Sequence, residues 1–394
     1  MDYHFSDRVS KLKPSAIREI LKHTSNPEVI PFAAGNPAAD AFPKETIEKI
    51  SSEILNSDPI GALQYSITEG YSPLRELLKK ELAVKNCFIK GRDNLIITSG
   101  AQQANELASK VLCSDGDTLI CESPSFIGSL NAFKSYNVNL VGIELEDDGI
   151  NIEKLEIAIK SNKNVKLLYL IPNFQNPTGN TMSLEKRKAV YELASKYDFI
   201  ILEDNPYGDL RFRGEDIPPI KSFDTEGRVI YSRTFSKILA PGLRVGYVSA
   251  PSEIISKMIV CKQVADVHTN IWAQQICFKF MEKVDIESHL SSIRKIYKSK
   301  YELMEEGIRN HFSDKVKVTE PEGGLFIWAT LPDSIDMMTF CKKAVEEYKV
   351  AVVPGNAFTI SENDRTNSFR MNFSTPSDDQ IVLGCEILGK LTKE

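Results

Sequence analysis

The residues best suited to chemistry lie in the stretch YSRTFSKILAPGLRVGY, residues 231–247. Lys237 stands there between Ser236 and an apolar Ile-Leu-Ala run, and Thr234 and Arg244 lie nearby. Hydroxyl groups and an arginine are residue types that hold an anion such as a phosphate. An ordinary lysine has a pKa of about 10.4, so it acts as a nucleophile or base only where burial or neighbouring positive charge lowers that value. The stretch predicts a reactive amine beside an anion site, with a solvated surface lysine as the alternative.

Other polar residues follow apolar runs in the same way. Gly100, Ala101 and Gln102 follow NLIITS and open a helical pattern, where small residues let backbone N–H groups approach an anion. Asn176 lies in a QNPTG turn after LYLIPN, and Asp204 follows FIILE. Ligands of parallel α/β sheets bind beyond the carboxyl ends of the strands. Each motif is weak by itself, but together they predict one shared ligand site.

The elements that must position these residues form an alternating pattern. Short apolar, β-branched runs are typical of strands buried on both faces: NLIITSG, DTLICES, VNLVGIEL, VKLLYLIPN, DFIILEDN, RVIYSRTF and RVGYVSA. Helical patterns such as AQQANELASKVLC and SLEKRKAVYELASKYD lie between several of them. The alternation predicts an α/β fold with a mostly parallel central sheet flanked by helices.

The pattern changes near the long amphipathic helix HLSSIRKIYKSKYELMEEGIRNHF. A few non-sequential strands follow it, with a further helix around residues 338–348, which indicates a smaller α+β domain. We therefore predict three parts. Residues 1–45 form an N-terminal arm and helix that docks on the small domain, residues 46–289 form a large domain, and residues 290–394 form the small C-terminal domain.

The composition is that of an ordinary globular protein, with 394 residues of which 42% are hydrophobic and 26% charged. A net charge of −6 argues against nucleic acid as a partner. No apolar run reaches the roughly 18 residues that a membrane span needs, and the N-terminus lacks a secretory h-region. Seven cysteines without a C-x-x-C pair suit the reducing cytoplasm. The five histidines lack metal-binding spacing, so we expect no metal site.

Six motifs, in order along the chain, resemble those of a known family. They are TSGAQQ, NPTG, EDNPYGDL, SRTFSKILAPGLRVGY, GGLFIW and SFRMNFS. As a set they are similar to those of the class I pyridoxal-phosphate aminotransferases of fold type I. LQYSITEGYSPLRELL, FAAGNPAADAFP and ESPSF resemble the 2-aminoadipate/kynurenine aminotransferase-like subgroup. The resemblance extends from about residue 14 to about residue 376, and it implies a smaller α+β domain beside the parallel sheet.

The activity that this resemblance implies is transfer of an amino group between an L-amino acid and a 2-oxo acid, with 2-oxoglutarate as the expected acceptor, by a ping-pong mechanism. The implied donor is 2-aminoadipate, glutamate, or an aromatic or branched amino acid. Pyridoxal 5′-phosphate is the implied cofactor. The resemblance also implies a cytoplasmic homodimer with composite active sites, and small molecules as partners rather than nucleic acid or a membrane.

The resemblance gives roles to the residues of the anion site. Lys237 would join the cofactor aldehyde as an imine. The phosphate would be held by three side chains and by backbone at the start of the helix after NLIITS: Thr234, Ser236, Arg244, Gly100, Ala101 and Gln102. Many relatives have a serine at position 101, but a backbone N–H at Ala101 still serves the phosphate.

The same resemblance surrounds the cofactor ring. Asp204 would face the pyridine nitrogen and keep it protonated, so that the ring accepts the electrons released at the substrate Cα. Tyr207 and Asn176 would hydrogen-bond the ring's 3-oxygen. Phe126 would stack on the ring, although relatives often carry a tyrosine there, so a hydroxyl near the reacting centre is lost.

Substrate binding is also implied. Arg370 would hold the α-carboxylate as a bidentate fork, with Asn176 and Gly35 beside it. Tyr65 would reach the phosphate of the neighbouring subunit. Arg18 lies off the apolar stripe of the predicted helix PSAIREILKHT and would meet an acidic substrate side chain.

Bland explanations stay open for these residues. They are a strand-end cap for Asp204, packing for Tyr207, core filling for Phe126, a surface pair with Asp378 or Asp379 for Arg370, a packed turn for Tyr65 and solvent for Arg18. At the level of function, a β-eliminating lyase, decarboxylase or racemase would use the same cofactor residues. A transcription regulator built on this domain would need a basic winged helix before KPSAIREIL, where the sequence has a short segment, so we expect an enzyme.

Overall fold

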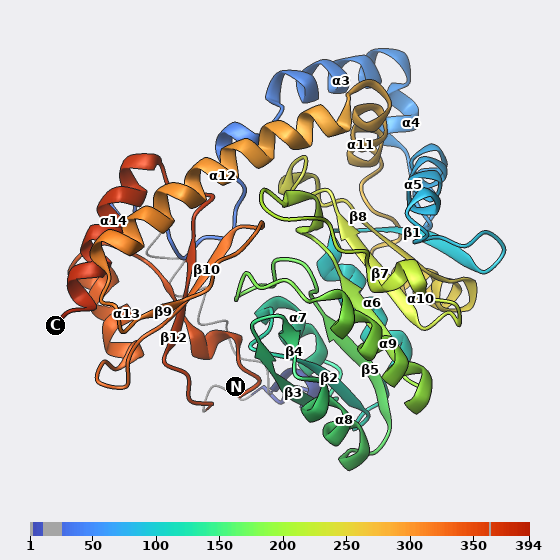
Figure 1. The fold of residues 1–394 in the computed structure, drawn as a ribbon. Coiled ribbons are helices and arrows are strands. Elements are labelled where there is room, and N and C mark those ends of the chain that lie inside the picture. The colour runs from blue at the N-terminus through green and yellow to red at the C-terminus, as the bar shows by residue number, and fades with distance from the viewer. Residues whose placement is uncertain (1–2, 11–25, 362–363) are drawn as a thin grey trace.

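We describe the protein from a computed structural model, which defines residues 3–10, 26–361 and 364–394. In this part of the chain two β-sheets lie side by side, each with helices packed against it (Figure 1). The long helix α12 (Ile286–His311) runs from the helices above the larger sheet to the smaller sheet.

The larger sheet has eight strands within the described residues, in the order β1-β8-β7-β6-β5-β2-β3-β4. The pairs from β7 through β6, β5 and β2 to β3 are parallel, whereas β8 is antiparallel to β1 and β7, and β4 to β3. The strands are β1 (Asp93–Thr98), β2 (Thr118–Ser123), β3 (Asn139–Glu146), β4 (Gly149–Ile150), β5 (Val165–Leu170), β6 (Ile200–Asp204), β7 (Val229–Thr234) and β8 (Gly246–Pro251). The mostly parallel sheet predicted from the sequence is confirmed.

Central strands of this sheet are buried on both faces, as their continuous hydrophobicity predicts. On β5, Tyr169 packs in one core with α6 (Ala101–Leu112). The preceding side chain, Leu168, points to the opposite face and packs with α8 (Ile152–Ser161) and α9 (Leu184–Tyr197). The two helical patterns that the sequence predicted between strands are α6 and α9.

β3 departs from its prediction. The run VNLVGIEL forms a strand as expected, but most of its residues are exposed or half-buried. β3 lies near one end of the sheet, where its outer neighbour is the two-residue strand β4. Solvent therefore reaches side chains that a central strand would bury, and the prediction of burial on both faces was wrong for this run.

Further helices complete the layers around the larger sheet. α5 and α11 pack with β1 and β8 in a second core, and α10 packs against α6. The bounds are α3 (Lys44–Ser57), α4 (Pro59–Leu63), α5 (Ser72–Val84), α7 (Ile127–Lys134), α10 (Ser252–Asp266) and α11 (Ile271–Lys283). Short turns are α1 (Asp7–Ser10), η1 (Ala39–Ala41), η2 (Gly208–Leu210), η3 (Ile220–Phe223), η4 (Pro241–Leu243) and η5 (Gly355–Phe358).

The smaller sheet is antiparallel, in the order β11-β12-β10-β9. Its strands are β9 (Lys317–Val318), β10 (Phe326–Thr330), β11 (Val353–Pro354) and β12 (Ser368–Asn372). α12, α13 (Met337–Glu346) and α14 (Asp378–Leu391) accompany it. The long amphipathic helix and the helix near residue 340 were both predicted.

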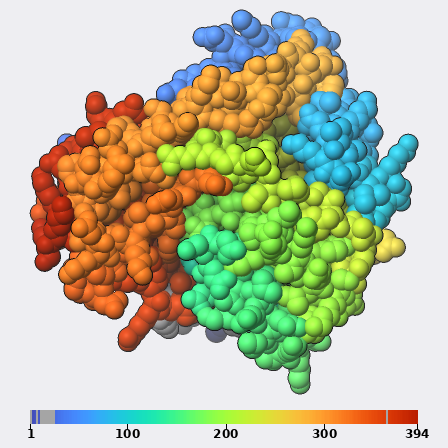
Figure 2. Space-filling view, viewed as in Figure 1, coloured from blue at the N-terminus to red at the C-terminus, as the bar shows by residue number. Residues whose placement is uncertain are grey.

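Two segments join the halves of the molecule. Ile30 pairs with Val350 in a parallel bridge, and Phe32 O accepts a 2.8 Å hydrogen bond from Asn372 N, so the chain after residue 26 lies on the smaller sheet. The yellow-green chain after β6 fills the space below α12 (Figure 2) and bridges to the smaller unit through Arg211 and Gly323. The predicted N-terminal helix with Arg18 lies outside the described residues, and the three-part domain division stays a prediction.

None of the helices within residues 3–10, 26–361 and 364–394 combines the length and the hydropathy that a membrane crossing needs.

Candidate active site

A cavity of about 510 Å³ opens where the strands of the larger sheet end and the smaller sheet begins. It is lined by most of the residues that the sequence singled out: Gly35, Ala101, Gln102, Phe126, Asn176, Asp204, Tyr207, Thr234, Ser236, Lys237, Arg244 and Arg370. These residues come from both sheets and from the N-terminal segment. The predicted convergence of separate strand ends on one site is therefore present in the fold.

Lys237 projects into this cavity from the turn after β7. Its Nζ donates a 2.9 Å hydrogen bond to the backbone oxygen of Gly35 and lies 5.9 Å from the centre of the Tyr207 ring. Burial lowers the pKa of Lys237 to about 8, and the positive charges of Arg370 and Arg244 contribute to the same shift. With this pKa roughly a tenth of the amine is uncharged at pH 7, far more than for an ordinary lysine, and the uncharged form is the one that a nucleophile or base requires.

The predicted anion-binding cup is assembled around Arg244. Its guanidinium contacts the Ser236 hydroxyl at 3.5 Å and donates to the backbone oxygen of Ser99 at 3.1 Å. Thr234 Oγ1 lies 2.9 Å from Ser236 Oγ. Gly100 has a φ of 79°, and a Cβ atom there would lie 2.3 Å from the Arg244 side chain. Glycine is needed at this point so that the arginine and the backbone can meet.

The start of α6 completes the cup. α6 begins at Ala101, directly after the N-cap residue Gly100, so the N–H groups of its first turn lie at the cavity wall. Such N–H groups and the helix dipole favour an anion. The Gln102 side chain is engaged elsewhere, because its Nε2 donates to Gly128 O at 2.8 Å. Ala101 and Gln102 therefore offer backbone rather than side-chain donors.

Asp204 ends β6 at the floor of the cavity. Its Oδ2 accepts hydrogen bonds from Asn105 Nδ2 at 2.7 Å and from Tyr169 OH at 2.9 Å. Its Oδ1 is buried and has no hydrogen-bond partner among the described residues. Burial raises the pKa of Asp204 to about 6, although the two hydrogen bonds favour its ionised form. A strand-end cap would not leave one carboxylate oxygen aimed at a cavity.

Three residues of this arrangement were missed by the sequence analysis. Asn105, Ser129 and Tyr169 form a closed set around Asp204, with Ser129 Oγ 3.0 Å from both the Asn105 amide and the Tyr169 hydroxyl. Asn105 has a readable signal, because it lies one helical turn after Ala101 and so on the same face. Tyr169 stands inside the apolar run VKLLYL, where nothing in the sequence separates it from an ordinary core residue.

Tyr207 and Asn176 meet on one wall. The Asn176 amide donates to Tyr207 OH at 3.4 Å, and the Tyr207 ring packs edge-on against Phe326 at 5.8 Å. Burial raises the pKa of Tyr207, so its hydroxyl stays neutral and can donate a hydrogen bond. Both the packing and the functional interpretation of Tyr207 are compatible with this geometry, because the ring packs while the hydroxyl lines the cavity.

Arg370 enters the cavity from β12. It donates to Asn176 Oδ1 at 2.9 Å and to the backbone oxygens of Ala33 and Ala34 at 2.9 and 3.2 Å. Its Nε is buried without a hydrogen-bond partner in the described part of the chain. The alternative pairing with Asp378 or Asp379 is wrong, because Arg370 is buried and makes no ion pair with either within the described residues, where Asp378 lies 3.5 Å from Lys300. A buried guanidinium without a carboxylate partner is suited to an anionic ligand.

Phe126 is held over the cavity by its neighbours. It is the N-cap residue of α7, and a Cβ at Gly128 would lie 2.7 Å from its ring. The ring is half-buried and also packs against the main core, so it fills space and lines the cavity at once. Tyr65 is placed differently: it is 81% exposed and packs edge-on against His268 at 5.9 Å, away from the cavity of its own chain.

Comparison with known proteins shows which proteins the chain is similar to. The model of the family "Aminotransferase class I and II" matches residues 27–388. Aromatic-amino-acid aminotransferase 1 of Thermococcus litoralis is 42% identical over 400 residues, which cover 100% of this chain and 95% of that protein. The 2-aminoadipate transaminase of Thermus thermophilus is 33% identical over 392 residues, covering 99% and 96%. The crystal structure of Pyrococcus horikoshii kynurenine aminotransferase in complex with PMP superposes with a TM-score of 0.95 at 41% identity, covering 99% of this chain and 96% of that one.

The chain belongs to the class I and II aminotransferases. It is a transaminase of fold type I that depends on pyridoxal 5′-phosphate. The family, fold and cofactor expected from the sequence motifs are thereby confirmed, including the resemblance to 2-aminoadipate and kynurenine aminotransferases.

The residues present fit this cofactor. Asp204 Oδ1, buried without a partner among the described residues, suits the protonated nitrogen of a pyridine ring. The cup of Arg244, Ser236 and the start of α6 suits a phosphate. A buried amine, Lys237, lies in the same cavity.

Proposed function

We propose that the protein transfers the amino group of an L-amino acid to 2-oxoglutarate by a ping-pong mechanism, and that Lys237 holds the cofactor covalently. The observation that carries this proposal is the position of Lys237, a buried amine whose charged form is disfavoured, beside two arginines. The cofactor, when bound, supplies an electron sink for the charge that develops at the substrate Cα.

The site geometry supports a further set of proposed cofactor contacts. Asp204 Oδ1 would accept a hydrogen bond from the protonated ring nitrogen, while Asn105 and Tyr169 keep the carboxylate oriented through Oδ2. Tyr207 OH and the Asn176 amide would hold the 3-oxygen, and Phe126 would cover one ring face. Thr234, Ser236, Arg244 and the backbone of Gly100, Ala101 and Gln102 would hold the phosphate.

Proton movement falls to Lys237. Its Nζ, when not joined to the cofactor, is the base that takes the proton from the substrate Cα. Burial, with the positive charges of Arg370 and Arg244, lowers the pKa of that amine and so favours its uncharged form. Arg370 would bind the substrate α-carboxylate as a bidentate fork beside Asn176 and Gly35, which fixes the Cα–H bond toward the lysine.

Borohydride tests the covalent role directly. Reduction of the yellow holoenzyme should fix the cofactor to the peptide that contains Lys237. Lys237→Ala should lose transamination while it keeps the fold. Transamination at the wild-type rate by Lys237→Ala would sink the assignment.

The amino donor that we propose is an aromatic L-amino acid. Relatives that share 41–42% of residues are named for aromatic amino acids and for kynurenine. Among the described residues that line the cavity, Lys237, Arg244 and Arg370 are the cations, and Phe326, Ile127 and Ala33 supply apolar walls. An aromatic side chain suits such walls.

Acidic substrates require a further cation. A ping-pong enzyme must accept 2-oxoglutarate in the same pocket as the donor, and we propose that Arg18, outside the described residues, meets its distal carboxylate. 2-Aminoadipate, the substrate named for a relative at 33% identity, would use the same contact. Screening amino donors against 2-oxoglutarate, with glutamate formation as the readout, decides between aromatic and acidic donors.

We also propose a homodimer with composite sites. Ile60 and Leu63 on α4 are each 71% exposed, and Tyr65, two residues further along the chain, is 81% exposed, so apolar side chains of the kind that partners cover gather at this point of the chain. Tyr65 would reach the phosphate of the neighbouring chain. Mixing inactive Tyr65→Phe and Lys237→Ala subunits should restore activity, because one mixed site keeps both groups. No recovery in verified heterodimers of two clearly impaired variants would argue for a self-contained site.

Two further proposals complete the assignment. A cytoplasmic location is supported by the free state of all seven cysteines. Transfer rather than elimination or decarboxylation is supported by the aminotransferase names of the relatives. A 2-oxo acid co-product without net loss of amino groups is the expected result, and release of ammonia or carbon dioxide would favour the lyase or decarboxylase alternative.

A further inference from the structure

A second polar cluster lies behind the phosphate cup, outside the cavity. Its centre is Asp266, the last residue of α10, whose Oδ2 accepts hydrogen bonds from Lys262 Nζ at 2.9 Å, Gln103 Nε2 at 2.7 Å and Ser99 Oγ at 2.9 Å. Lys262 also donates to Gln103 Oε1 at 2.7 Å, and its side chain is fully buried. The cluster therefore ties the end of α10 to the first turn of α6.

Ser99 connects this cluster to the cup through all of its polar atoms. Its N–H donates to Gln103 Oε1 at 2.8 Å, its hydroxyl donates to Asp266, and its carbonyl oxygen accepts from Arg244 at 3.1 Å. Ser99 directly precedes Gly100, where α6 is capped. A shift of Ser99 would move both the arginine and the helix start that form the cup.

The loop after Asp266 has a strained backbone. Val267 adopts φ 65° and ψ −62°, and His268 N donates to Asp266 O at 2.7 Å, which makes a tight γ-turn. A β-branched residue adopts this conformation only where its surroundings enforce it. The hydrogen bonds of Asp266, together with the 3.2 Å contact between Ser99 Oγ and Thr269 Oγ1, enforce it here.

We propose that Asp266 and Lys262 are positioning residues for the cofactor phosphate, which they place by fixing Ser99 and, through it, Arg244 and the start of α6. Neither side chain lines the cavity. Lys262 neutralises Asp266, so that the carboxylate orients the cup without repelling the phosphate. The inference rests on the proposed placement of the phosphate in the cup.

A purely electrostatic effect of Asp266 would change the affinity for the phosphate in the opposite direction from a positioning effect. If Asp266 acted on the phosphate through its charge alone, Asp266→Ala would remove a nearby negative charge and tighten binding of the phosphate. If Asp266 acts by positioning, the same change loosens the cup and weakens binding. Asp266→Asn separates the two further, because it removes the charge but keeps an acceptor oxygen.

The test uses apoprotein titrated with pyridoxal 5′-phosphate and with pyridoxal, which lacks the phosphate. Asp266→Ala should raise the Kd for pyridoxal 5′-phosphate about tenfold, as expected for loss of charge-assisted hydrogen bonds, and leave the Kd for pyridoxal within about twofold. Asp266→Asn should lie between wild type and Asp266→Ala. Ser99→Ala, which deletes one hydroxyl and endangers the fold least, should show a smaller loss of the same kind.

Control variants distinguish a failure of this proposal from a failure of the proposed phosphate site. Glu253→Ala removes a carboxylate from the first turn of the same helix, about 20 Å away along α10, and should change neither Kd. Inorganic phosphate should raise the Tm of wild-type apoprotein more than that of Asp266→Ala. Unchanged or tighter binding of pyridoxal 5′-phosphate by Asp266→Ala, or an equal loss for both ligands, would overturn the proposal. Arg244→Ala should abolish the preference for the phosphorylated ligand, and its failure to do so would show that the cup itself is misplaced.

Discussion

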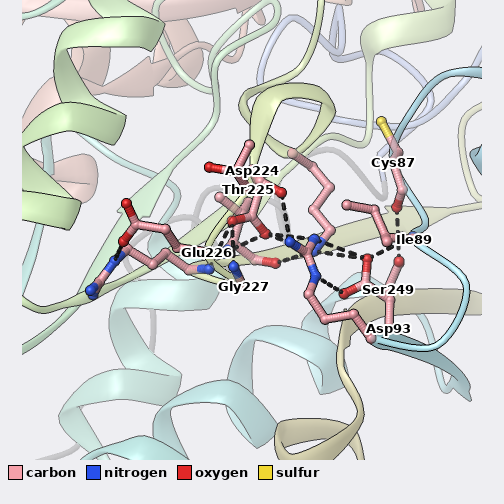
Figure 3. A network of polar contacts seen from close by, with 12 residues as sticks. Cys87, Ile89, Asp93, Asp224, Thr225, Glu226, Gly227 and Ser249 are labelled. Carbon is pink, nitrogen blue, oxygen red and sulfur yellow. Dashed lines mark hydrogen bonds and ion pairs between the residues drawn. The ribbon is translucent and has the colours of Figure 1, made fainter.

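Lys221 and Lys237 lie near opposite ends of strand β7, and the two lysines have different surroundings. Near its start, Lys221 Nζ lies 3.0 Å from Asp224 Oδ2, 3.3 Å from Asp93 Oδ2 and 3.0 Å from the backbone oxygen of Val229. Figure 3 shows this network, in which Asp93 and Asp224 are joined to neighbouring backbone and side-chain groups by many polar contacts. Arg92 also donates to both carboxylates, at 3.0 and 3.2 Å.

Beyond the other end of β7, Lys237 has a backbone oxygen as its hydrogen-bond acceptor and two arginines as its charged neighbours. Asp204 and Arg370 each keep a buried polar atom without a partner within the described residues. Complete pairing is what structural charges need, because an unpaired buried charge destabilises a fold. The difference teaches that charged groups left incompletely paired around one cavity, here Asp204 and Arg370, mark the site where a ligand completes the pairing.

The largest expected effect concerns Asp204. Asp204→Asn cannot keep a pyridine nitrogen protonated, so kcat should fall by roughly 10²- to 10³-fold, the scale for losing a preorganised electrostatic group. Single-turnover and steady-state assays of the holoenzyme would measure it. Asp224→Asn is the matched control in the distal network and should leave kcat of the folded enzyme within about twofold. A nearly unchanged kcat for Asp204→Asn would contradict the claim that the incompletely paired Asp204 serves the cofactor.

The pH dependence of stability should also differ between Asp204 in the cavity and Asp224 in the paired network. Burial raises the pKa of Asp204 to about 6 in the folded protein, above the value of about 3.9 expected for an unfolded chain. The folded state therefore holds the proton more tightly, and the apoprotein should lose roughly 2–3 kcal/mol of unfolding free energy as pH rises from about 4 to about 6.

Denaturant unfolding of the apoprotein across that pH range measures this loss. Asp204→Asn should remove it, since the amide does not titrate, and should leave the slopes from other groups in place. Asp224 behaves oppositely: although burial alone would raise its pKa, Lys221 and further hydrogen bonds lower it. If the unfolding free energy of Asp204→Asn changed with pH as it does in the wild type, the raised pKa of Asp204 would not be the cause of the loss.

The smallest effect extends the comparison to the substrate's own charge. Arg18→Ala should lower kcat/KM for glutamate or 2-aminoadipate by roughly 10- to 100-fold, because a charge-assisted hydrogen bond contributes about 1.5–3 kcal/mol. Activity on an aromatic amino acid should change much less. Equal losses on both substrate classes would mean that Arg18 only holds its helix in place.

The sequence located the chemistry where a polar residue follows an apolar strand. Asp204, Lys237 and the Gly100 turn were readable in this way, because parallel strands bring their carboxyl ends to one edge. Arg370 was assigned by resemblance, and its buried contacts with Asn176 then excluded a pair with Asp378.

Other features could not be read because they depend on distant partners. From the sequence Tyr169 is an ordinary core residue, and only the structure shows that its hydroxyl lies 2.9 Å from Asp204 Oδ2. Nothing in the sequence around Lys262 marks it as buried, yet its side chain is fully buried against Gln103 and Asp266. The exposure of β3 depends on its place near the edge of the sheet, and hydrophobicity does not encode strand order.

The most direct test of the central claim makes the same substitution at Lys221 and at Lys237, the lysines near the two ends of β7. In apoprotein at pH 7, Lys221→Met should lower the free energy of unfolding by about 3–5 kcal/mol, because it removes the buried one of the two cations that pair with Asp93 and Asp224 and leaves only Arg92. Lys237→Met should instead raise it by roughly 2–3 kcal/mol, since it removes an ammonium whose pKa burial has lowered. A loss of stability of similar size in both variants would contradict the claim that one cluster is structural and the other is held ready for a ligand.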